Sequence, residues 1–133
     1  MKDQAIAQAQ SQYEELITKE ANDIITQSAW LRGNYVDFVK KRTEYKVQNI
    51  LKQGENSALV SVVIISMTTP QRKTLADIAS RVIADKERNF NFSNALQLIA
   101  KQTGSSATSD EMGITTVKMR KSGGSWVAEK PTP

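Results

Sequence analysis

Any acid–base chemistry in this chain would have to use carboxylates, lysines or tyrosines, because the sequence contains neither histidine nor cysteine. Without histidine the chain lacks the commonest general base and the usual partner of a catalytic serine. Without cysteine it has no disulfide, thiolate zinc site, iron–sulfur cluster or cysteine nucleophile. We therefore predict no metal site, no cofactor and no catalytic residue, and we favour a role other than that of an enzyme.

Tyrosines and aspartates supply the one catalytic alternative that the composition leaves open. An apolar pocket raises the pKa of a carboxyl group, and a tyrosine beside it can stabilise an oxyanion. An isomerase or dehydratase of this type requires a buried carboxylate that faces a cavity. Asp37, close to Tyr35 in the sequence, is more simply an exposed helix residue. The residues concerned are Tyr13, Tyr35 and Tyr45 with Asp23, Asp37 and Asp77.

Three aromatic residues are the candidates for binding a ligand: Trp30, Tyr35 and Trp126. Large aromatic rings contribute much apolar contact area, and the indole N–H or phenol O–H adds a polar group that fixes orientation. The alternative is a structural role, in which the rings anchor the core and their polar groups bond near the surface. Both readings stay open for these residues.

Charge is distributed unevenly along the chain, whose net charge is +4. Residues 1–30 carry two positive and five negative charges, whereas residues 31–52 carry six positive and two negative ones. A basic segment can bind phosphate, nucleic acid or anionic lipid. Nucleic-acid sites usually combine a denser basic patch with aromatic rings for stacking, so we expect no nucleic-acid partner. No stretch approaches the 18–20 apolar residues of a transmembrane helix.

The first half of the chain predicts a long helix and then a hairpin. Apolar residues recur at steps of three and four from Ile6 to Ile25, which predicts one amphipathic helix over residues 1–30 that ends at Gly33. A short helix follows at about 35–41. Alternation from Tyr45 onward and the run Ala58–Met67, on either side of a Gly54 turn, predict an antiparallel hairpin over 43–68.

The second half predicts helices, a loop and a second hairpin. Thr69 as N-cap and Pro70 at the first helical position begin a helical segment over 70–103. Residues 103–113 are polar and predict a mobile loop. A pair of glycines, Gly123 and Gly124, centres a hairpin over 114–130. The expected fold is α+β: a single domain over residues 1–133, with the helices covering one face of a curved antiparallel sheet of at least four strands.

This order of elements resembles the NTF2-like (cystatin-like cone) superfamily. The ending from Thr116 to Val127 is similar to the last hairpin of small bacterial members, secreted or lipid-anchored, of the lumazine-binding-like or unknown-function type. In it Val and Lys alternate, a Gly turn follows and a Trp opens the final strand. The middle helical segment, residues 70–103, is longer than in a minimal member, and four strands are fewer than in fuller ones.

The resemblance implies a non-enzymatic extracytoplasmic binding or accessory domain, periplasmic or at the cell surface, for a small molecule or a protein partner. Periplasmic scaffold subunits of secretion assemblies are also NTF2-like, so a protein-interaction or scaffold module is the first alternative. In that case the acidic first helix and the basic 31–52 segment are complementary surfaces for a homodimer. The isomerase or dehydratase is the second alternative. Met1 is either the native start or replaces a removed targeting segment.

Overall fold

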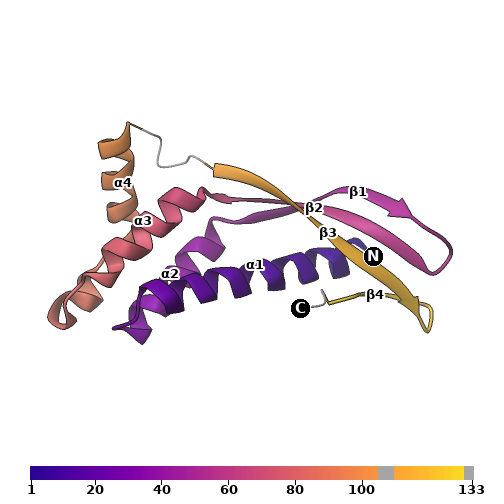
Figure 1. The fold of residues 1–133 in the computed structure, drawn as a ribbon, viewed down its shortest axis with the longest axis horizontal. Coiled ribbons are helices and arrows are strands. Elements are labelled where there is room, and N and C mark those ends of the chain that lie inside the picture. The colour runs from indigo at the N-terminus through magenta and orange to yellow at the C-terminus, as the bar shows by residue number, and fades with distance from the viewer. Residues whose placement is uncertain (105–109, 131–133) are drawn as a thin grey trace. The chain divides into compact units, whose positions relative to one another are not determined.

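The computed structural model describes residues 1–104 and 110–130 and confirms the α+β class (Figure 1). The first elements are α1 (Lys2–Ile24), α2 (Ala29–Lys41), β1 (Glu44–Lys52) and β2 (Ser57–Met67). The later ones are α3 (Thr69–Ser80), the 3-10 turn η1 (Ala84–Asn89), α4 (Phe92–Thr103), β3 (Asp110–Ser122) and β4 (Ser125–Ala128). The chain divides into two compact units: unit 1 is Met1–Tyr13, Glu44–Ile65 and Met112–Pro133, and unit 2 is Glu14–Thr43 and Ser66–Glu111.

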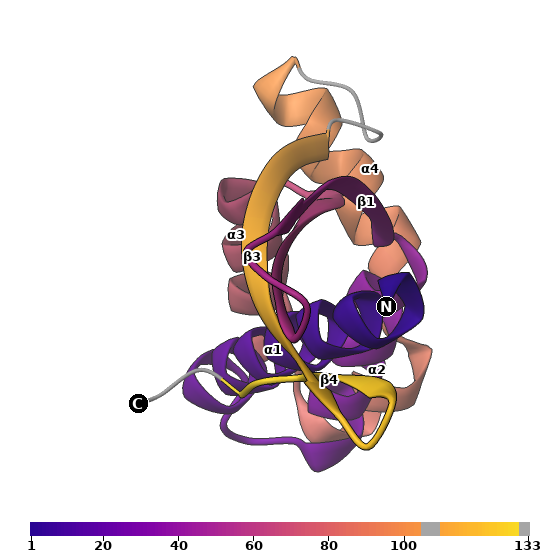
Figure 2. The same ribbon diagram turned by 90° about the vertical axis from the view of Figure 1, so that its right-hand side faces the viewer.

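The strands form one four-stranded sheet in the order β1-β2-β3-β4, and both predicted hairpins are antiparallel. Figure 2 shows that the sheet is curved and that the N-terminal part of α1 lies on its concave side. The core between them contains small helix residues packed on β-branched strand residues. Its buried members are Ala5, Ala9, Ala58, Val60, Val62, Val117 and Met119.

A β-bulge at Gln48 changes which residues of β1 face this core. The register runs Lys46↔Val63 and Val47↔Val62 and then resumes at Asn49↔Ser61, which leaves Gln48 as the extra residue. The uniform alternation expected from the sequence is therefore wrong beyond Val47. Tyr45 and Val47 pack against the core before the bulge and Ile50 after it, whereas Leu51 is 56% exposed.

The last hairpin turns on two glycines, as predicted. Ser122 pairs with Ser125, so Gly123 and Gly124 are the two turn residues, with φ of 59° and 81°. A two-residue turn with both φ angles positive matches the right-handed twist of the flanking strands. Residues with a side chain are strained in this conformation, so the sequence can place the turn.

The long first helix ends earlier than predicted. It stops at Ile24, and Ser28 begins a second helix by accepting a hydrogen bond from the Leu31 N–H at 3.1 Å. Gly33 lies inside this second helix instead of ending the first. A serine at an N-cap accepts a hydrogen bond from one of the free N–H groups at the start of a helix. Ser28 therefore favours the start of a new helix, although the apolar stripe continues through this region.

Two more boundaries differ from the prediction. Thr68, and not Thr69, is the N-cap of α3, with its hydroxyl oxygen 3.2 Å from the Gln71 nitrogen, so Pro70 is the second helical residue. Strand β3 begins at Asp110, so residues 110–113 are strand and not loop. The remaining part of the predicted loop, 105–109, lies outside the described residues. Gly104 ends α4 in the left-handed conformation with φ of 69°.

Unit 2 is helical and has a core of its own. Helices α3 and α4 belong to this unit together with α2 and the later part of α1. Fully buried side chains in unit 2 include Ile17, Ile25, Leu31, Tyr35, Val39, Met67 and Leu75. No helix in the described part of the chain is long and apolar enough to cross a bilayer.

Candidate functional site

The three aromatic candidates for ligand binding are distributed over the two units. Tyr35 and Trp30 belong to unit 2 and Trp126 to unit 1. Tyr35 is fully buried, with its hydroxyl 3.4 Å from Glu20 Oε2 and 3.4 Å from the carbonyl oxygen of Arg72. It therefore holds three helices of unit 2 together.

Both tryptophans are partly buried. The guanidinium of Arg88 lies 5.4 Å from the centre of the Trp30 ring, which is the geometry of a cation–π contact. Trp126 packs at the border of the unit 1 core. The hollows described below are lined by other residues. Each of the three aromatics thus makes packing contacts, and a role in ligand binding stays a prediction.

The aspartates do not provide the buried carboxylate that an isomerase or dehydratase needs. Asp23, Asp37 and Asp77 are all exposed, and Asp77 forms a 2.7 Å ion pair with Arg81. Tyr13 and Tyr45 meet edge to face, with ring centres 6.4 Å apart, so they pack against each other. These three aspartates therefore do not support the isomerase or dehydratase alternative. The described residues contain no group of three or more acidic side chains arranged to hold a metal ion.

The strongest candidate site is a groove on unit 2, which we call the Phe90 groove. It consists of two adjoining hollows of about 650 Å³ and 340 Å³ that share Asn89 and Phe90. The larger hollow continues over Arg81, Val82, Ile83 and Lys86. The smaller one runs along α4 and is also lined by Ile78, Asn91, Asn94, Ala95, Leu98, Ile99 and Gln102.

Local sequence explains how Phe90 comes to lie at the centre of this groove. It follows η1 and precedes Asn91, whose side-chain oxygen caps α4 by accepting from the Asn94 N–H at 3.0 Å. The Phe90 ring meets the Phe92 ring edge to face at 4.8 Å, and Phe92 in turn stacks on Phe38 at 5.8 Å. Phe90 is therefore fixed on one side by the buried Phe92 ring and lines the groove on the other.

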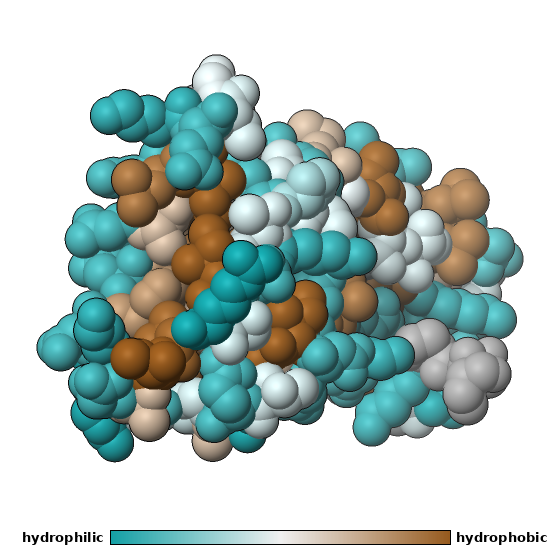
Figure 3. Space-filling view, turned by 60° about the vertical axis from the view of Figure 1, so that its left-hand side comes forward, coloured by the Kyte–Doolittle hydropathy of each residue, from teal (hydrophilic) through white to brown (hydrophobic). Residues whose placement is uncertain are grey.

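Two large apolar side chains lie exposed at the groove. Leu98 is 60% exposed and Ile83 is 59% exposed. On the face that Figure 3 turns to the viewer, hydrophobic residues form a band bordered by hydrophilic ones. Contiguous exposed apolar surface of this kind often marks an interaction site. The sequence prediction missed the groove, since it treated residues 70–103 as one helical segment, whereas α3 ends at Ser80 and Ile83 lies beyond it.

The charge at the groove is positive. Arg81 is paired with Asp77, the Ser28 hydroxyl donates to Glu87, and Arg88 stacks on Trp30. Within the described residues Lys86 takes part in no ion pair, so its ammonium group is available to a partner. At the α4 end the polar lining consists of uncharged amides, Asn91, Asn94 and Gln102.

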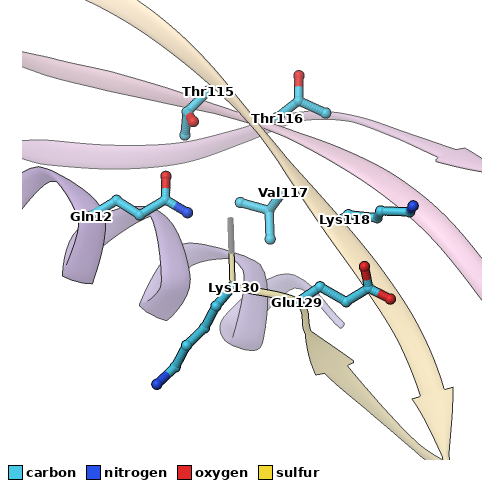
Figure 4. Close-up of a pocket in the computed structure, with 7 residues that line it drawn as sticks. All are labelled: Gln12, Thr115, Thr116, Val117, Lys118, Glu129 and Lys130. Atoms are coloured by element: carbon cyan, nitrogen blue, oxygen red, sulfur yellow. The ribbon is translucent and has the colours of Figure 1, made fainter. Parts of the chain in front are cut away.

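A third hollow, of about 380 Å³, lies in unit 1 beside β3 (Figure 4). Figure 4 shows the Gln12 side chain of α1 reaching toward Thr115 and Val117, while Thr116 points to the opposite side of the strand. Lys118, Glu129 and Lys130 complete its lining.

No family model, curated protein or solved structure matches this chain.

Proposed function

We propose that this chain is a non-enzymatic binding domain that uses the Phe90 groove to hold a short amphipathic helix of a protein partner. The observation that carries the proposal is that two hollows meet at Phe90, with the apolar side chains of Leu98 and Ile83 exposed in their lining. Such a surface is unfavourable in water unless a partner covers it.

The shape of the groove favours a helix as the occupant. From the N-cap Asn91 to Gln102 of α4, the residues that line it recur at steps of three and four, so they form one face of the helix over three turns. Twelve helical residues span about 18 Å, which is enough to seat two or three turns of a partner helix. Apolar anchors at helical spacing are the usual way in which a helix binds a groove.

The charged and polar residues of the groove indicate which side chains the partner helix should carry. Lys86 lines the larger hollow, and Asn89, Asn91 and Asn94 offer hydrogen bonds without charge. A partner helix with a carboxylate near Lys86 would gain a charge-assisted contact, and a basic helix would be disfavoured there. The proposed partner is thus an apolar helix with at least one acidic residue.

The homodimer through opposite charges receives less support. Part of the acidic first helix is neutralised within unit 2, because Glu14 lies 3.7 Å from Lys40 and Glu20 binds Arg72 at 2.6 Å. These carboxylates are less available to a second copy.

An extracytoplasmic location and membership of the NTF2-like superfamily belong to the proposal, and the Thr116–Val127 ending supports them. Fractionation of the native host, with an antibody against the chain, tests the location. Recovery in the periplasmic or surface fraction agrees with the proposal, and recovery in the cytosol alone contradicts it.

A displayed library of random helical peptides tests the groove. The library is selected on the wild-type protein, and binders that also bind Leu98→Ser are removed. Leu16→Ser is the matched control, since Leu16 is a helix leucine of unit 2 that is 48% exposed and outside the groove. We expect enriched peptides with apolar residues at steps of three or four and an acidic residue, bound equally by wild type and Leu16→Ser.

The same library can overturn the proposal. If selection yields no peptide that distinguishes Leu98→Ser from wild type, the groove is not a helix site. Enriched peptides without helical spacing, or with lysine and arginine in place of acidic residues, would contradict the proposed class of partner.

A further inference from the structure

The edge of β3 that faces β4 is paired along only part of its length. The β3–β4 ladder extends from Ser122↔Ser125 to Met119↔Ala128, and one more hydrogen bond joins the Glu129 N–H to the Lys118 carbonyl at 2.8 Å. Strand β3 itself begins at Asp110. Among the described residues no strand pairs with this edge between Asp110 and Val117.

The pairing pattern identifies which groups the open edge offers. Main-chain groups of a strand point alternately to its two neighbours. Ser122 closes the hairpin and Lys118 accepts from Glu129, so the even-numbered residues address the β4 side. Lys121 points the other way, since its N–H donates to the Asn56 carbonyl at 2.8 Å. The next N–H and C=O groups on the open edge therefore belong to Thr116, Ile114 and Met112.

This edge lacks the features that protect the opposite edge of the sheet. Strand β1 carries the Gln48 bulge and the exposed Lys46 and Lys52, and both features discourage pairing with a foreign strand. Residues 112–117 contain no charge and no proline. The side chains of Met112 and Ile114 are 67% and 58% exposed. An uncharged apolar edge of this kind is a template for strand addition.

Space and chemistry beside the edge are also suitable. The 380 Å³ hollow lies against Thr115–Lys118, with the Gln12 amide on its far side (Figure 4). Lys118 and Lys130 line the hollow, and Glu129 is 3.9 Å from Arg120, so the excess charge there is positive.

We propose that an extended segment of a protein partner pairs with β3 along Met112–Lys118 as an added strand. The segment alternates apolar β-branched residues, which would lie beside Ile114, with polar ones, and carries a carboxylate for Lys118 and Lys130. This site belongs to unit 1 and is independent of the Phe90 groove. At the β3 edge a partner would be bound through main-chain hydrogen bonds, whereas in the Phe90 groove it would be bound through side chains.

The probe is a seven-residue peptide of alternating valine and threonine with one central glutamate, blocked at both ends. The matched control peptide is N-methylated at every residue, which removes the N–H groups from both of its edges. Binding is followed by amide NMR spectra and hydrogen exchange. We expect the Ile114 and Thr116 amides to shift and to become protected on binding, and the N-methylated peptide to bind at least about tenfold more weakly.

Two substitutions separate edge pairing from other binding. Ile114→Glu places a charge on the open edge that also repels the glutamate of the peptide, and it is expected to weaken peptide binding about tenfold. Leu51→Glu makes the same change at an exposed apolar residue of β1 and is expected to leave peptide binding unchanged. Both variants are compared with wild type for folding by the dispersion of their amide spectra.

Several outcomes would overturn the inference. One is that neither peptide binds at millimolar concentration, and another is that the N-methylated peptide binds as well as its parent. A third is that the shifted amides lie outside residues 112–118. Protection of Ile114 and Thr116 that rises with protein concentration, in the absence of peptide, would assign the edge to a second copy of this chain instead of a partner.

Discussion

Glu20 and Arg72, which are 52 residues apart in the sequence, form a two-point ion pair inside unit 2. Arg72 Nε lies 2.6 Å from Glu20 Oε2, and Arg72 Nη2 lies 2.8 Å from Oε1. The exposed fractions of the two side chains are 3% for Arg72 and 13% for Glu20. The pair, with the Tyr35 hydroxyl beside it, links α1, α2 and α3.

Breaking this pair is expected to destabilise the protein strongly. Glu20→Ala leaves the Arg72 guanidinium buried without its carboxylate, and such a loss typically lowers the free energy of unfolding by about 3–5 kcal/mol. Replacing both partners, Glu20→Leu with Arg72→Met, should recover most of that loss, because no charge remains buried. Urea denaturation measures both changes.

The exposed pair Asp77–Arg81 is the control for this experiment. Its side chains are 53% and 76% exposed, so Asp77→Ala should change the free energy of unfolding by less than about 1 kcal/mol. If Glu20→Ala has no larger effect than Asp77→Ala, the interior position of the Glu20–Arg72 pair is wrong.

Two glycines predict changes in stability of opposite sign. Gly124 has a positive φ of 81°, so Gly124→Ala should lower the free energy of unfolding by about 1–2 kcal/mol. Gly33 lies inside α2, and a Cβ there would have no atom within 4 Å, so Gly33→Ala should raise it by about 0.5–1 kcal/mol. Thermal denaturation of both variants under one set of conditions makes the comparison. If the two substitutions change the free energy of unfolding in the same direction, either the helix assigned at Gly33 or the turn assigned at Gly124 is wrong.

The pKa of Glu111 gives a prediction for pH. The Thr69 hydroxyl donates to Glu111 Oε1 at 2.6 Å and lowers the pKa of this carboxyl below its ordinary value of 4.5, with a smaller contribution from the charge of Arg72. Thr69→Val should move the pKa of Glu111 back toward 4.5, as NMR titration of the side-chain carboxyl would show.

The sign of the pH effect follows from this direction. A carboxyl whose pKa is lower in the folded state stabilises the fold above its ordinary pKa, and this stabilisation is lost as the pH falls through the folded value. Glu111→Gln should therefore be less stable than wild type at neutral pH and equal to it in strong acid. A difference in stability that grows as the pH falls would exclude this role of Glu111.

The sequence predicts most of the sheet because its signals are local. Paired glycines specify the Gly123–Gly124 turn, and the apolar run of β2 specifies a central strand. The early start of β3 was missed, because Asp110 and Gly113 have the composition of a loop. Pairing with the 11-residue strand β2 makes them part of the sheet. The length of β3 is thus set by its pairing with β2, which the composition of residues 110–113 does not reveal.

The break in the first helix and the Phe90 groove were missed for a related reason. The apolar stripe runs on from Ile24 to Trp30, so periodicity alone does not show that Ser28 caps a new helix, although serine is a common N-cap. The groove joins Ile83, Phe90 and Leu98 from separate segments. A single exposed leucine on α4 is ordinary by itself, and only tertiary packing places it beside Phe90.

The extra residue Gln48 also affects how relatives of this chain can be recognised. In a relative without this residue, every second residue along all of β1 would face the core. Here the core-facing positions are odd-numbered up to Val47 and even-numbered from Ile50. An alignment that allows no gap inside a strand would then set core positions against exposed ones over half of β1. A one-residue deletion permitted at position 48 brings the two patterns back into phase, so the search for distant relatives is best made with that gap allowed.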